Sequence, residues 1–177
     1  EETDTDEVFV FPGMGDEGIT VGGALQYLLE QDGLDAWLKQ RRRLSSVYLG
    51  RDYTAEADQV LAANGALKRI DGNPAETAAE LIASGKAGAI YDGRMEFGPR
   101  ALGARSILAN PADAEINASL NARLQRTEFM PFAPYVAEED ADSVFDITQA
   151  NRYAASFMTI TTAVKPEWHK RIPAVVH

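Results

Sequence analysis

Short apolar runs alternate along this chain with longer segments in which apolar residues recur at helical spacing. Five runs have the length and composition of strands: residues 8–12, 46–50, 66–70, 87–93 and 132–136. Five segments are predicted as helices: residues 19–31, 54–65, 73–85, 112–123 and 138–145. The alternation of strand and helix from Leu44 onward is typical of an α/β fold.

End signals define two of these helices more closely. Thr54 is expected to cap the helix of residues 54–65, and Gly65 to end it. Pro74 suits a first helical position, and Gly85 is expected to stop that second helix. The two helices therefore have predicted boundaries as well as a predicted periodicity.

The run at residues 87–93 is almost wholly apolar, as in a strand that is covered on both faces. We therefore expect residues 87–92 to form an interior strand of a mixed, twisted sheet flanked by helices. Gly22 and Gly23 lower helix stability inside the first helical segment, so we expect another part of the protein to pack closely against them.

A glycine-rich turn at residues 13–18 joins the first apolar run to the first helix. Such a turn lets backbone N–H groups approach a phosphate at the helix N-terminus, and Asp16 could hold a metal ion or orient a ligand. A turn that only connects strand and helix is the commoner case. A lone strand, loop and helix cannot bury both faces of the strand, so we expect this chain to be a piece of a longer protein.

Composition excludes several classes of function. The 177 residues carry a formal net charge of -10, which disfavours nucleic-acid binding, and they include no cysteine and two histidines. Disulfide, thiolate and histidine-rich metal chemistry are therefore excluded. No apolar run is long enough to cross a membrane, and the acidic N-terminus lacks the basic start of a signal peptide. We expect a soluble, cytoplasmic protein.

Charge is unevenly spread along the chain. Residues 1–38 include no lysine or arginine, whereas Lys39 and the arginines at 41–43 form a compact basic run. This change predicts a boundary near residue 40. The three arginines are interpreted as a solvated connector, because no glycine-rich cradle adjoins them.

The most unusual stretch follows the apolar run at 87–93. Arg94, Arg100 and Arg105 stand there with one glutamate, Glu96, inside a strongly acidic chain. One guanidinium group can bind two oxygens of a phosphate or carboxylate at once. Open α/β sheets bind ligands at the carboxyl ends of their strands. We therefore predict that the three arginines converge on one anion site.

Neighbouring residues suit the same site. Gly98 and Gly103 allow close backbone approach or positive φ, and Pro99 fixes a turn. Ser106 adds a hydroxyl that can donate a hydrogen bond to the anion. The alternative from composition is that the arginines pair with surface carboxylates, which contributes little energy when the pairs are exposed.

Three motifs in order, "PGMGDEGITVGGAL", "GRMEFGPRALGARSILANP" and "LNARLQRTEFMPFAPYV", resemble the carbamoyltransferase family of nodulation and antibiotic-tailoring enzymes. The resemblance covers nearly the whole chain. It implies that residues 1–40 are the C-terminal remnant of an actin-like, Kae1-like transferase domain, and residues 45–177 the larger part of a YrdC-like domain. The YrdC-like domain would form carbamoyl adenylate from carbamoyl phosphate and ATP. The Kae1-like domain would pass the carbamoyl group to a hydroxyl of a small-molecule acceptor.

The resemblance also implies roles for residues. Arg100 and Arg105 would be catalytic and, with Arg94 and Ser106, would surround carbamoyl phosphate or the adenylate phosphate. Gly98 and Gly103 would let the backbone approach the nucleotide. Asp16 would stand at a divalent metal, Mg or Fe, in the full-length protein.

The chain departs from the family pattern at one cationic position. Many members have a lysine before the "FAP" segment, whereas Gln125 stands nearest to it here, with Arg123 and Arg126 as the adjacent candidates for substrate binding. Because the upstream catalytic residues of the Kae1-like domain are missing, this chain alone should not complete the transfer. Two alternatives remain: a YrdC-type threonylcarbamoyl-adenylate synthase that acts with a partner, and a non-catalytic interaction module.

Overall fold

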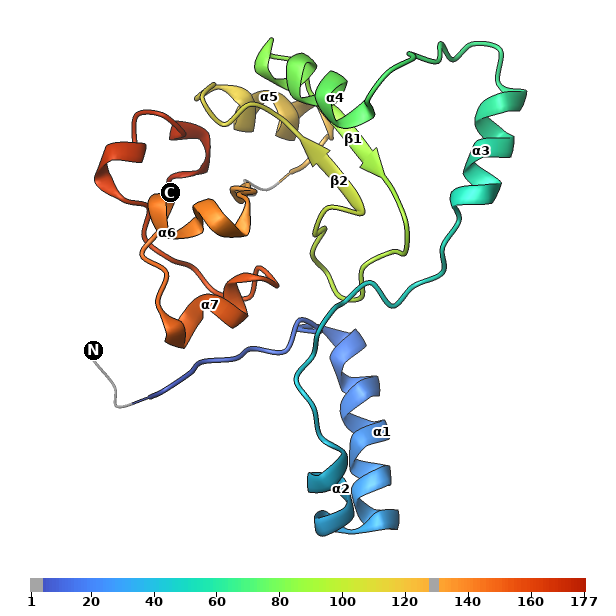
Figure 1. The fold of residues 1–177 in the computed structure, drawn as a ribbon, viewed down its shortest axis with the longest axis vertical. Coiled ribbons are helices and arrows are strands. Elements are labelled where there is room, and N and C mark those ends of the chain that lie inside the picture. Colours follow the sequence, from blue (N-terminus) through green and yellow to red (C-terminus); the bar gives the residue numbers. More distant parts are fainter. Residues whose placement is uncertain (1–4, 128–130) are drawn as a thin grey trace.

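A computed structural model describes residues 5–127 and 131–177 (Figure 1). The α-helices are α1 (Asp16–Asp32), α2 (Leu34–Gln40), α3 (Thr54–Ala63), α4 (Pro74–Ala83), α5 (Ile116–Arg123), α6 (Ala141–Val144) and α7 (Gln149–Ala155). The strands are β1 (Gly88–Tyr91) and β2 (Arg105–Leu108), and short 3-10 helices lie at η1 (Glu138–Asp140), η2 (Pro166–Trp168) and η3 (Pro173–Val175). Helices with a small sheet agree with the predicted α/β class.

The sheet is smaller than the sequence predicts. β1 pairs with β2 alone, antiparallel, in a register that sets Gly88 opposite Leu108 and Tyr91 opposite Arg105. The prediction of an interior strand in a mixed sheet is wrong for the described residues, because three of the four residues of β1 are exposed. The apolar composition of the run predicts burial on both faces, but within residues 5–127 and 131–177 α4 packs against β1 and no second sheet layer covers it.

The other four predicted strands are not strands, although two of them do pair locally. Residues 8–12 are extended, and the Val8 N–H donates to the carbonyl of Ala150 at 2.9 Å. Residues 46–50 form two backbone hydrogen bonds with the segment around Phe97: the Val47 carbonyl accepts the Phe97 N–H, and the Gly50 N–H donates to the Met95 carbonyl. Residues 66–70 are exposed throughout, and residues 132–136 lack a ladder partner in the described chain. An apolar composition predicts that a segment is suited to a strand, but it does not show that another strand lies beside it to pair with.

The helices follow their end signals with one correction. Asn73 caps α4 by accepting the N–H of Ala75 at 3.0 Å, Pro74 is the first helical residue, and Gly85 follows the helix at φ 86°. Thr54 is inside α3 and does not cap it. Instead, one carboxylate oxygen of Asp52 accepts both the Thr54 N–H at 2.9 Å and the Thr54 hydroxyl at 2.6 Å. Helix α7, which begins at a Thr148 capping box, was missed by the sequence analysis.

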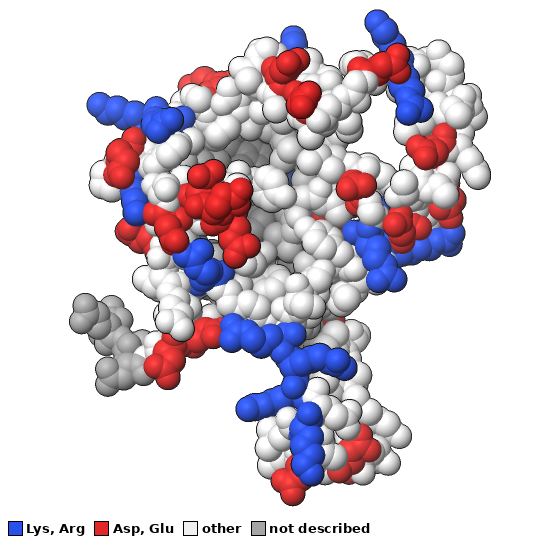
Figure 2. All heavy atoms as spheres, in the orientation of Figure 1, with Lys and Arg blue, Asp and Glu red and all other residues white. Residues whose placement is uncertain are grey.

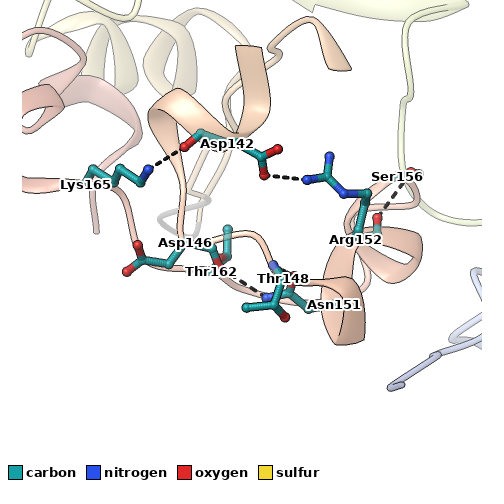
Figure 3. Close-up of polar contacts among 8 residues, drawn as sticks. All are labelled: Asp142, Asp146, Thr148, Asn151, Arg152, Ser156, Thr162 and Lys165. Carbon is teal, nitrogen blue, oxygen red and sulfur yellow. Dashed lines mark hydrogen bonds and ion pairs between the residues drawn. The ribbon is translucent and has the colours of Figure 1, made fainter. Parts of the chain in front are cut away.

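Most of the buried apolar side chains lie in the C-terminal part of the chain. They are Leu120, Val144, Phe145, Ala154, Phe157 and Ala174, with Val47 and Ala104 near the sheet. Polar contacts join α6 to α7 and to the following segment (Figure 3): Asp142 pairs with Arg152, and Lys165 donates to the carbonyl of Asp142. These contacts hold the C-terminal elements around a small core.

The first two helices form a hairpin that projects from the rest of the chain (Figure 1). Helix α1 packs mainly against α2. The expectation of a close neighbour at Gly22 and Gly23 is wrong within the described chain, since nothing lies within 4 Å of a Cβ built on either glycine. Within residues 5–127 and 131–177, no helix is long and apolar enough to span a membrane.

Candidate functional site

The arginine stretch forms the connection between β1 and β2, and the carboxylate of Glu96 organises its second half. One oxygen, Oε1, accepts the backbone N–H groups of Leu102 at 2.8 Å, Ala104 at 2.7 Å and Arg105 at 3.2 Å. Glu96 is 9% exposed, so these bonds replace the water that its charge loses on burial. The connection therefore folds around an internal anion.

Hydrogen bonding outweighs burial at this carboxylate. Burial raises the pKa of Glu96, but its own backbone N–H and those of Leu102, Ala104 and Arg105 lower it, and the net pKa lies below the ordinary 4.5. Glu96 is thus ionised at neutral pH. The position of Glu96 as a lone carboxylate among glycines and arginines is a sequence signal, because such a carboxylate needs hydrogen-bond donors when it is buried. The sequence-based prediction gave Glu96 no role.

The two glycines of the stretch have a positive φ, which is one of the two properties expected of them. Gly98 has φ 104°, and a Cβ there would lie 2.7 Å from the carbonyl oxygen of Pro12. Gly103 has φ 106°, and its Cβ would lie 3.2 Å from the hydroxyl of Tyr135. Gly98 is therefore required by its backbone conformation and by its packing against Pro12, and Gly103 by its backbone conformation; their predicted role at a nucleotide stays a prediction.

Arg105 is engaged within the connection. Its guanidinium donates to the carbonyl oxygens of Asp92 and Ala104, both at 2.8 Å, and Gly93 at 3.1 Å, and it lies 3.6 Å from the centre of the Tyr91 ring. The bonds to Asp92 and Gly93 and the contact with the Tyr91 ring hold the end of β1 against the start of β2. A catalytic role for Arg105 stays a prediction, and any ligand would have to use the donors that these bonds leave.

Ser106 also serves the turn. Its hydroxyl oxygen accepts the Gly103 N–H at 2.8 Å, which leaves the hydroxyl proton available to another acceptor. The loop N–H groups of residues 102–105 are therefore all directed at side-chain oxygens of the loop. They stabilise the backbone turn and are not available to an external phosphate.

Arg94 lies near an acidic neighbour. It forms an isolated backbone bridge with Asp52. The pKa of the Asp52 carboxylate is lowered mainly by its hydrogen bonds to Thr54, and the positive charges of Arg105 and Arg94 lower it further. The structure thus brings Arg94 and Arg105 to one carboxylate. No ion pair joins either guanidinium to Asp52 in the described residues, so the predicted anion site and the alternative of surface ion pairs both stay open for these two arginines.

Arg100 has a different environment. Its side chain lines a hollow of about 550 Å³ with Met14, Met158 and the segment 159–161. Arg100 is exposed, and no hydrogen bond or ion pair engages its guanidinium within residues 5–127 and 131–177. Two threonines, Thr159 and Thr161, add hydroxyls to the same wall. Arg105 uses its donors within the connection, whereas in the described residues the guanidinium groups of Arg94 and Arg100 are not engaged, and of these two Arg100 lines the hollow.

The remaining predicted basic residues, Arg123 and Arg126, are not part of this connection. Arg123 ends α5 and is exposed, while the Arg126 guanidinium lies 5.5 Å from the centre of the Phe132 ring. Their predicted role in substrate binding stays a prediction. Residues 128–130 of the third motif lie outside the described residues.

Asp16 is the first residue of α1 and is exposed. The Glu17 carboxylate accepts the Gly15 N–H at 3.1 Å, so an amide that could meet a phosphate is already bonded. The described part of the chain contains no group of three or more His, Asp or Glu side chains that could hold a metal ion. Among the described residues Asp16 has no partner ligands for a metal ion, and its predicted place at a divalent metal of the full-length protein stays a prediction.

Basic side chains gather where the α1–α2 hairpin joins the rest of the chain (Figure 2). The arginines at 41–43 are exposed, as predicted for a connector. Arg43 pairs with Glu7 and lies 4.1 Å from the centre of the Tyr153 ring, so it also attaches the N-terminal segment to α7.

The class of protein follows from a family match. Residues 79–177 match the family described as Carbamoyltransferase C-terminus, a range that includes β1, β2 and the whole connection between them. The match covers more than half of the chain. The chain belongs to this family, as the three motifs indicated.

Curated relatives resemble the chain over almost its entire length. Nodulation protein NolNO of Sinorhizobium fredii is 38% identical and Nodulation protein NolO of Bradyrhizobium diazoefficiens 36% identical, each over 97% of this chain, which is 25% and 31% of those proteins. An uncharacterized protein of Methanocaldococcus jannaschii is 35% identical over 100% of this chain and 29% of its own length. The chain spans about a quarter to a third of the length of these relatives.

Proposed function

We propose that this chain is part of an ATP-dependent O-carbamoyltransferase, in which it helps to bind the phosphate groups during formation of carbamoyl adenylate. The family match and the nodulation relatives support transferase chemistry. The observation that carries the proposal for this chain is the unpaired Arg100 guanidinium on a rigidly held loop beside a hollow of about 550 Å³.

The proposed reaction has two stages. Water first releases inorganic phosphate from carbamoyl phosphate, and an oxygen of the resulting carbamate attacks the α-phosphorus of ATP. The bond from that phosphorus to the β-phosphate oxygen breaks, and pyrophosphate leaves. In the second stage a hydroxyl oxygen of a small-molecule acceptor attacks the carbamoyl carbon, and AMP leaves.

Arg100 suits the first stage. Charge moves onto the departing pyrophosphate, and a guanidinium already in place stabilises that charge without rearranging. Two of its N–H groups can bind two phosphate oxygens together, and the hydroxyl of Thr161 could donate to another. The Kae1-like domain, the acceptor and the divalent metal of the second stage are implied by the family resemblance alone. The metal would need ligands from outside the described residues.

The test is carbamoyl-phosphate-dependent release of pyrophosphate by the full-length protein that contains this chain. Replacing Arg100 by Ala should lower that rate at least tenfold, which is about 1.4 kcal/mol of transition-state stabilisation. Arg100→Lys should restore only part of the activity, because it keeps the charge but loses the paired geometry. Arg69→Ala is the matched control, since Arg69 is exposed and lies between α3 and α4.

The outcomes separate the proposal from its alternatives. An unchanged rate in folded Arg100→Ala protein would contradict the role of Arg100. Pyrophosphate release that requires threonine would favour the threonylcarbamoyl-adenylate synthase. Absence of any carbamoyl-phosphate-dependent release by the wild-type protein would favour the interaction module.

A further inference from the structure

Glu96 is the one buried charged side chain in the described residues, 5–127 and 131–177. A carboxylate is rarely buried unless it is paired with a cation or held by several donors. Here no ion pair involves it, and three backbone N–H groups of a single turn converge on its Oε1. The arrangement stabilises one backbone conformation of the turn.

The bonds to Glu96 fix one end of the segment 98–102. The Leu102 N–H donates to Glu96 at 2.8 Å, and the Leu102 carbonyl accepts the hydroxyl of Tyr48. The other end is fixed by separate contacts: the Phe97 N–H donates to the carbonyl of Val47 at 2.7 Å, and Gly98 lies against the backbone of Pro12. Arg100 is at the centre of this segment, between two anchored ends.

We propose that Glu96 is a positioning residue that holds the Arg100 guanidinium at the phosphate of the ligand. This inference rests on the proposed function, because it assigns Glu96 a task in the same site. Glu96 does not bind the ligand. Its carboxylate accepts the backbone N–H groups of the turn that follows Arg100. Those N–H groups are then not available to a phosphate, so the phosphate would be bound by the Arg100 guanidinium.

The physical reason is preorganisation. A guanidinium on a mobile loop loses conformational entropy when it binds phosphate, and this loss weakens binding. A guanidinium on a fixed loop has already lost that entropy when the protein folds, so its binding of phosphate is not weakened in this way. A displacement of about 1 Å at a reacting group can lower a rate on the order of a hundredfold. Removing the acceptor for three N–H groups would release this turn and leave those donors unsatisfied.

A double-mutant cycle between Glu96 and Arg100 tests the inference in the full-length protein. Glu96→Ala should lower kcat/KM for carbamoyl phosphate about tenfold or more when Arg100 is present. In the Arg100→Ala background the same change should cost no more than about threefold, because the group that Glu96 positions is already gone. Glu80→Ala, an exposed carboxylate of α4, is the control and should leave kcat/KM unchanged.

Two milder variants separate positioning from folding. Glu96→Gln keeps an acceptor oxygen at Oε1 and should retain kcat/KM within about threefold of the wild type. Glu96→Asp keeps the charge but withdraws the oxygens by one methylene group, and should lose activity like Glu96→Ala. If Glu96→Ala does not fold, the cycle is measured with Glu96→Asp. Far-UV circular dichroism and the thermal midpoint report the fold of each variant.

Each result is decisive. Non-additive losses together with rescue by Gln support the positioning role. Additive losses in folded variants overturn it while leaving the role of Arg100 intact. If Arg100→Ala itself has no effect, the proposed function of Arg100 fails and the inference fails with it.

Discussion

Replacing Gly98 by Ala is the most direct test of how the arginine loop is held. Gly98 has φ 104°, a conformation that residues with a Cβ adopt only under strain. The added Cβ would also lie 2.7 Å from the carbonyl oxygen and 3.3 Å from the carbonyl carbon of Pro12, which are backbone atoms that cannot rotate away. Both effects act in the folded state and destabilise it.

The magnitude follows from the two effects. A strained backbone conformation costs about 1 to 3 kcal/mol, and forcing an extra carbon into a close contact costs about the same again. Gly98→Ala should therefore lower the free energy of unfolding by about 2 to 6 kcal/mol. For a protein of this size the lower bound corresponds to a fall of roughly 4 to 8 °C in the thermal midpoint.

Two other glycines separate strain from crowding in the same measurement. Gly88 has an ordinary φ and open space, so Gly88→Ala should be neutral or slightly stabilising. Gly93 has φ 53° and open space, so Gly93→Ala should lose only about 1 kcal/mol, the cost of the left-handed conformation. Thermal and urea unfolding would rank the three variants. If Gly98→Ala unfolds at the midpoint of Gly88→Ala, the close approach to Pro12 does not exist in solution.

Two further predictions concern a helix cap and pH. Asn73→Ala removes the side-chain oxygen that accepts the Ala75 N–H and should lower the unfolding free energy by about 1 kcal/mol, whereas Asn73→Asp, measured beside it by urea unfolding, should retain the cap. Because the pKa of Glu96 lies below 4.5 in the folded state, its carboxylate contributes stability above that pH, and this contribution is lost as the pH falls through the folded pKa. Urea midpoints measured from about pH 7 to about pH 3 should therefore fall less steeply for Glu96→Gln than for the wild type, and equal slopes would contradict the assignment.

The helices could be predicted because their signals are local. Pro74 and Gly85 bound α4 within two residues of the predicted ends, since each acts through its own backbone. Strands depend on partners that the sequence does not name. The run at 66–70 holds Leu67 and Ile70 at strand-like spacing, yet it is exposed throughout and pairs with no strand of the described chain.

The site divides in the same way. Gly98 and Gly103 were expected to allow a close backbone approach or a positive φ, and both have a positive φ, because the residue type itself carries that information. The partners of the arginines were not predictable from spacing. Arg105 is engaged by carbonyl groups from both ends of the connection, whereas Arg100, five residues earlier, lines a hollow with residues from distant segments. Glu96 was overlooked because its role arises only when the chain turns back on it.

The α1–α2 hairpin leaves and rejoins the rest of the chain at neighbouring points. On the outgoing side Gly13 lies against the Phe97 ring, and on the returning side the carbonyl of Val47 accepts the Phe97 N–H, while Arg43 pairs with Glu7 across the two segments. The hairpin therefore closes a loop, and the entropy of closing a flexible loop grows only with the logarithm of its length, by about 0.6 kcal/mol for each doubling. Insertions and deletions within the hairpin would leave its entry and exit in place, so chain length can vary there with little disturbance of the arginine loop.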